Sequence, residues 1–100
     1  MRNDYLLLMH NDVPESRRLP DEAWGVYLAG LRESGALQGG SSIGDGVCMK
    51  KEGPAPEITR YLGGYIKVRA ASLEDARQLV VGNPVYEGGG TVEVRELPKD

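Results

Sequence analysis

The sequence predicts an α+β fold in which two helices cover one face of a four-stranded sheet. The clearest observation is that residues 62–76 run from an alternating strand directly into a helix with Ser72 at its N-cap. Two further segments read as strands: the short apolar run from Tyr5 to Met9, and residues 91–97, which alternate with a period of two. A fourth strand is indicated by Ala36 to Gly40, just before a glycine-rich stretch.

The first half of the chain supplies one strand and one helix. We expect the Tyr5–Met9 run to be central in the sheet and buried on both faces, because it has no polar alternation. A helix is expected after Asp21, ending at Gly35 as a C-terminal glycine stop. Its apolar residues recur at spacings of three and four and are Trp24, Tyr27, Leu28 and Leu31.

The second half supplies the remaining elements. Gly46 to Lys50 is expected to form an arm of an extra β-hairpin. Ile66 and Val68 alternate with charged and aromatic neighbours, so only one face of that strand belongs to the core. The helix after Ser72 is expected to stop near Gly82, because the following Asn83-Pro84 pair cannot continue it.

The order strand, helix, strand, strand, helix, strand is the ferredoxin-like βαββαβ arrangement, here with the extra β-hairpin, in a single domain spanning residues 1–100. With both helices on one face, the other face of the sheet is left uncovered. A first strand that is apolar throughout needs a cover on that side, and a second copy of the chain would provide it. We therefore expect a homodimer.

Composition narrows the classes of function. The chain is 40% hydrophobic and 27% charged, which indicates a globular protein, and it contains no long apolar run that could span a membrane. The net charge is −3 with scattered basic residues, so we expect no nucleic-acid partner. Cys48 is the only cysteine, and we expect neither a metal nor a cofactor. The short apolar run near the N-terminus lacks the features of a signal peptide, so we expect a cytoplasmic protein.

The sequence resembles the YCII-related domains, in particular the branch named for an Asp-Gly-Pro-Phe motif. The motif region reads Glu52-Gly53-Pro54-Ala55-Pro56-Glu57, followed at the family's spacing by Leu62-Gly63-Gly64-Tyr65, with the Asp and the Phe both replaced. Residues 71–76 and 89–95 are similar to family members almost residue for residue. The resemblance implies a dimeric α+β barrel built by two sheets face to face.

The resemblance also points to a cleft. The resemblance to the YciI-like branch implies an acid–base pair made of a histidine on the first helix and an aspartate in an Asp-Pro turn. Here Trp24 and Asn83 stand at those positions, and neither an indole nor an amide can shuttle protons at neutral pH. If the cleft is kept, we expect it to bind a ligand through Trp24, Tyr27, Asn83 and Tyr86. Aromatic residues at this helical spacing are more often core residues than ligand contacts, and some can be both.

Two other residues could rebuild a catalytic centre. His10 is the only histidine, and Asp12 lies two residues later, where it could orient the imidazole. The alternative is that His10 is a locally hydrogen-bonded residue at a strand end and that Asp12 forms a turn through its own backbone.

Three functions stay open from the sequence. The first is a YCII-related enzyme that performs acid–base or lyase-like chemistry on a small molecule in the cleft of a homodimer. The second is a non-catalytic ligand-binding or regulatory module, which the resemblance links to sigma-factor control of transcription. The third is structural dimerisation with no ligand.

Overall fold

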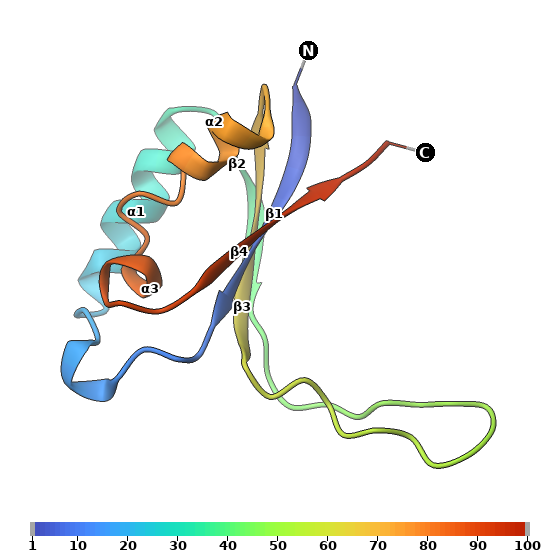
Figure 1. The fold of residues 1–100 in the computed structure, drawn as a ribbon. Helices are drawn as coiled ribbons and strands as arrows, with labels where there is room; N and C mark the ends of the chain where they lie inside the picture. The colour runs from blue at the N-terminus through green and yellow to red at the C-terminus, as the bar shows by residue number, and fades with distance from the viewer. Residues whose placement is uncertain (1, 100) are drawn as a thin grey trace.

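The computed structural model describes residues 2–99 and shows a single antiparallel sheet with helices on one side (Figure 1). The sheet order is β2-β3-β1-β4. The strands are β1 (Asn3–His10), β2 (Leu37–Ser42), β3 (Leu62–Ala70) and β4 (Val92–Leu97). The helices are α1 (Glu22–Glu33), α2 (Leu73–Gln78) and α3 (Pro84–Glu87), preceded by a 3₁₀ turn at Glu15–Arg17. None of these helices, within residues 2–99, is long and apolar enough to cross a membrane.

This topology confirms the predicted ferredoxin-like fold. The central strand β1 pairs with β3 on one side and with β4 on the other, both antiparallel. The helix boundaries follow the local signals: Gly35 ends α1 with a positive φ of 79°, and the Ser72 hydroxyl accepts a hydrogen bond from the Asp75 backbone N–H at 3.1 Å. Each predicted cap at these two ends is therefore in place.

Three expectations are corrected. Gly46 to Lys50 forms no strand, so the extra β-hairpin is instead an irregular connection between β2 and β3. Strand β1 is buried at alternate positions only: Leu7 is fully buried, whereas Leu6 and Leu8 are half-buried on the opposite face. A third, short helix, α3, begins at Pro84 with Asn83 as its N-cap, because proline fits the first turn of a helix even though it cannot continue one.

The core lies between the sheet and the helices. Its fully buried side chains include Tyr5, Leu7 and Val68, which come from neighbouring strands, with Leu31 of α1 and Ala76 of α2 packed over them. The register puts Tyr5 opposite Val68 and Leu7 opposite Ile66, so these residues share the helix-covered face. The uncovered face is called the outer face below.

Hydrogen bonds hold the loop after β1 in place at one end of this layer. The Asp12 carboxylate accepts hydrogen bonds from the Thr91 backbone N–H at 2.9 Å and from the Thr91 hydroxyl at 2.7 Å, and so ties the loop after β1 to the start of β4. These bonds to Thr91 hold the pKa of Asp12 below its usual value. The Asp12 carboxylate is thus a long-range link to β4 and not the local turn former of the sequence interpretation.

Candidate functional site

A pocket of about 810 Å³ opens between α1 and the end of the sheet where β2 meets β3; we call it the α1 pocket. Its floor is made by glycines of two strands, Gly39 and Gly40 of β2 and Gly63 and Gly64 of β3. Glycines carry no side chain, so at these four positions nothing rises from the sheet into the space below the helix. The pocket therefore follows from the sequence of these two strand ends.

The floor cannot easily be filled. A Cβ atom at Gly40 would lie 2.7 Å from the Tyr65 carbonyl oxygen, which belongs to the backbone and cannot move aside. Gly39 has a φ of 147° beside a register shift between Leu37 and Gly39, a conformation that favours glycine. A glycine is thus required at both β2 positions for steric or conformational reasons.

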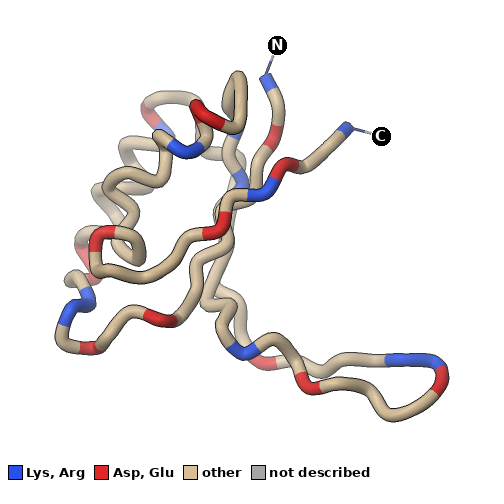
Figure 2. The backbone as a smooth tube through the Cα atoms, viewed as in Figure 1, with Lys and Arg blue, Asp and Glu red and all other residues tan. Residues whose placement is uncertain are grey.

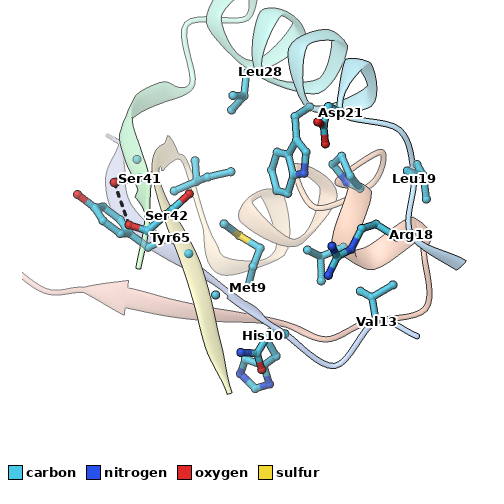
Figure 3. Close-up of a pocket in the computed structure, with 18 of the residues that line it drawn as sticks. Met9, His10, Val13, Arg18, Leu19, Asp21, Leu28, Ser41, Ser42 and Tyr65 are labelled. Atoms are coloured by element: carbon cyan, nitrogen blue, oxygen red, sulfur yellow. Dashed lines mark hydrogen bonds between the residues drawn. The ribbon is translucent and has the colours of Figure 1, made fainter. Parts of the chain in front are cut away.

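The walls are mainly apolar and come from several elements. Met9, Trp24, Leu28 and Ile66 line the pocket together with Pro84 and Val85 of α3. Figure 3 shows Met9 and Leu28 directed into the space from the strand and the helix. Of the four predicted ligand residues, Trp24 is the one that lines the pocket, and ligand contact by it stays a prediction.

The polar groups of the α1 pocket include Arg18, Asp21 and Arg32. Arg18 reaches toward the cavity from the loop before α1 (Figure 3). Within residues 2–99 its guanidinium forms no salt bridge, although it lies beside an apolar space. A guanidinium in this position can bind a planar anionic group through two parallel hydrogen bonds.

His10 lies at the rim of the α1 pocket, but its ring points away from the space (Figure 3). The imidazole Nε2 is 3.2 Å from Glu93 Oε1 on the outer face, and the ring packs against Tyr61 with a centroid distance of 4.7 Å. The hydrogen bonds from Arg95 first, and from His10 second, hold the pKa of Glu93 below its usual value. The carboxylate beside His10 is therefore Glu93 and not Asp12.

The other predicted ligand residues lie elsewhere. Tyr27 is buried in the core, where its hydroxyl donates a 2.6 Å hydrogen bond to the Leu79 carbonyl oxygen, and burial raises the pKa of this phenol. Tyr86 is half exposed on α3. The structure brings neither residue to the α1 pocket, and ligand contact by them stays a prediction.

Asn83 has a structural role beside the pocket. It is fully buried, and its Oδ1 accepts hydrogen bonds from the backbone N–H groups of Val85 and Tyr86, at 2.9 and 3.3 Å, so it is the N-cap of α3. Its position decides where Pro84 and Val85 stand in the pocket wall. An asparagine before a proline at N1 is a helix-start signal, and this signal could have revealed the role from the sequence.

Sequence reasoning missed the glycine floor and Arg18. The sequence puts Gly39 and Gly40 at the end of one predicted strand and Gly63 and Gly64 at the start of another, but their alignment across β2 and β3 depends on a register that sequence does not give. Arg18 carried no signal beyond its positive charge.

Comparison with known proteins agrees with this fold. The chain is a small α+β protein with a ferredoxin-like sheet. The chain belongs to the YCII-related domain family, whose model matches residues 4–98. Among solved structures, it is similar to a 5-chloro-2-hydroxyhydroquinone dehydrochlorinase from Burkholderia phenoliruptrix AC1100, in complex with 2,5-dihydroxybenzoquinone. The identity is 18%, the TM-score is 0.57, and the match covers 96% of this chain and 95% of that one, which establishes a shared fold. No curated protein matches the sequence.

Proposed function

We propose that this YCII-related protein binds a small, planar and anionic molecule in the α1 pocket. The observation that carries the proposal is the floor of glycines, above which about 810 Å³ of space is enclosed by mainly apolar walls. This volume lies in the range of about 300 to 1,000 Å³ that is typical of small-molecule sites. Arg18 provides the charge that a planar anion needs, and Trp24 provides an aromatic surface.

The similar structure supports the choice of ligand class. The dehydrochlorinase is in complex with 2,5-dihydroxybenzoquinone, a small ring with acidic hydroxyl groups. A ring of this kind would pack against Trp24 and Leu28 and place an oxygen toward Arg18. We therefore take hydroxylated aromatic rings and quinones as the first compounds to test.

Acid–base or lyase-like chemistry on such a ligand would require a proton-transfer group at the pocket. His10 and Asp21 are the candidates, because both side chains belong to residues that line it. His10 would first have to leave Glu93 and turn toward the pocket, since its ring now points to the outer face. Asp12 is a poorer candidate, because both its carboxylate oxygens are bonded to Thr91.

The alternative is a non-catalytic ligand-binding module. It is favoured by Trp24 and Asn83, which occupy the positions of the acid–base pair that the resemblance implies. Asn83 uses its side-chain oxygen to cap α3, a role that needs no proton transfer. Binding without conversion of the bound compound would identify this function.

We further propose that the protein is a homodimer that associates through the outer face. Leu6 and Leu8 are half-buried there, side by side with Tyr65 and Lys67 of β3 in the register of the sheet. A second sheet would remove these leucines from water. Sedimentation velocity at micromolar concentration distinguishes a dimer from a monomer of 10.9 kDa. A monomeric protein would contradict the proposal.

The binding proposal can be tested with Trp24 as its own reporter. Titration with 2,5-dihydroxybenzoquinone and with 2,5-dihydroxybenzoate should quench the tryptophan fluorescence, with calorimetry as an independent readout. Arg18→Ala should weaken binding by about tenfold or more, because a charged hydrogen bond is lost. Arg77→Ala on α2, whose guanidinium contacts only Glu74 among the described side chains, is the matched control and should bind like wild type.

Equal affinity of the Arg18→Ala and wild-type proteins would remove the α1 pocket as the binding site. Chromatography of the ligand after incubation then separates an enzyme from a binding module. A new product that disappears in His10→Ala supports the catalytic form of the proposal.

A further inference from the structure

The connection between β2 and β3, residues 43–61, leaves the body of the molecule as a long arm without regular structure (Figure 1). It extends on the side of the sheet away from the helices. The radius of gyration is 15.0 Å, compared with about 13 Å for a compact domain of this length. The arm therefore holds many residues away from the core.

The arm exposes apolar side chains that nothing in the chain covers. Val47 is 84% exposed and Met49 is 90% exposed, the two highest values among the large hydrophobic residues that the structure describes. They stand two positions apart, so in an extended segment they point to the same side. Cys48, between them, faces the other limb of the arm, with its Sγ 3.6 Å from the Glu57 carbonyl oxygen.

The backbone of the arm is open as well. In the described part of the chain, residues 44–60 form no backbone–backbone hydrogen bond, although Ile43 bonds to Gly63 and Tyr61 bonds to Asn11 at the two ends. An extended segment whose N–H and C=O groups are not bonded to other backbone groups can pair with the edge of a sheet. Gly46–Lys50 has a strand signal in its sequence but no strand partner in the single chain.

We propose that residues 46–50 become a strand by pairing with β4 of a second copy of this chain. The inference rests on the homodimer proposed above and adds the arm as a second, exchanged contact. The arm extends toward the side of the outer face, where that second copy would lie (Figure 1). The partner's β4 offers an edge, because β4 is the last strand of the sheet and pairs on one side only.

Two observations favour β4 over β2 as the acceptor. The register of β2 against β3 is interrupted between Leu37 and Gly39, which breaks the regularity of that strand, whereas β4 pairs with β1 without a shift. Charge also fits: Lys50 and Lys51 at the tip of the arm and Glu96 of β4 form no salt bridge among residues 2–99. In Figure 2 the tip of the arm carries basic residues followed by an acidic one, and β4 carries acidic residues on either side of a basic one.

The first experiment compares the dimer dissociation constant of the wild type with that of a Val47→Asp, Met49→Asp variant by sedimentation velocity. Two buried charges should weaken the dimer by about 100-fold or more. Val26→Asp is the matched control, because Val26 is 75% exposed on α1 and lies outside the proposed contact. It should leave the dissociation constant unchanged.

Hydrogen exchange reports the strand itself. The amides of residues 46–50 should be protected from exchange at protein concentrations above the dimer dissociation constant. They should exchange freely at concentrations below it. Charge reversal then tests whether β4 is the partner strand. Lys51→Glu should raise the dimer dissociation constant a few-fold at low salt, and the added change Glu96→Lys should restore the wild-type constant.

The outcomes separate this inference from the homodimer proposal. A stable dimer that is unchanged by the two aspartates, with residues 46–50 unprotected, overturns the arm contact and keeps the homodimer. A monomeric wild type overturns both. Protection that does not depend on concentration also overturns the inference, because the arm would then pair within its own chain.

Discussion

The two ends of the layer between the sheet and the helices differ sharply. At one end Tyr5, Leu7 and Val68 rise from the sheet and are fully buried beneath the helices. At the other end the strands carry glycines at positions 39, 40, 63 and 64, and the same two layers enclose the α1 pocket. The backbone architecture is continuous, so the missing side-chain volume at these glycines distinguishes the end that has a cavity from the end that is packed.

Truncation on one helix measures this difference. Leu31 and Leu28 lie three residues apart on α1; Leu31 is 5% exposed in the core, and Leu28 lines the pocket. Leu31→Ala should lower the free energy of unfolding by about 2 to 5 kcal/mol, because it leaves a cavity in packed surroundings. Leu28→Ala should cost about 1 kcal/mol, because it enlarges a space that already exists. Chemical denaturation measures both, and equal losses would show that the pocket collapses into core in solution.

Enlarging the same two side chains tests whether each site has room for additional atoms. Leu31→Phe should cost about 1 to 3 kcal/mol, because the core has no room for the ring. Leu28→Phe should leave stability within about 1 kcal/mol of wild type and should weaken ligand binding by at least about tenfold, since the ring enters the α1 pocket. The check is denaturation together with Trp24 fluorescence titration. Loss of stability without loss of binding in Leu28→Phe would contradict the assignment of the pocket.

The smallest effect concerns how the loop beside the pocket is held. Thr91 lowers the pKa of Asp12 in the folded state, so this stabilisation is fully present above the unfolded value near 3.8 and is lost as the pH falls through the lower folded pKa. Asp12→Asn should therefore lower the melting temperature at pH 7 by less than Leu31→Ala does. The difference from wild type should shrink between pH 4 and pH 2. A difference that stays constant over this range would show that charge is not what binds Asp12 to Thr91.

The sequence predicted most of the fold because its signals were local. Alternation around Ile66 and Val68 and the cap at Ser72 each act within a few residues, and both are confirmed. The α1 pocket was not predictable in the same way. It depends on which glycines of β2 lie opposite which glycines of β3, and a register shift near Gly39 sets that alignment.

The site residues show the same limit. Trp24 and Tyr27 share a helical pattern, yet Trp24 lines the pocket and Tyr27 bonds to Leu79 in the core. Periodicity identifies the buried stripe of a helix but not which of its residues meets a neighbouring side chain or an empty space. The strand predicted at Gly46–Lys50 is absent for a related reason. Local strand propensity produces a strand only where a partner strand is available.

The position of β1 has a consequence for the synthesis of the chain. This strand is made first but pairs only with β3 and β4, which begin at residues 62 and 92. At about 5 to 20 residues per second, its apolar residues wait for several seconds before β3 has been translated. Leu6 and Leu8 are therefore exposed to chaperones on the ribosome well before they can meet a second subunit.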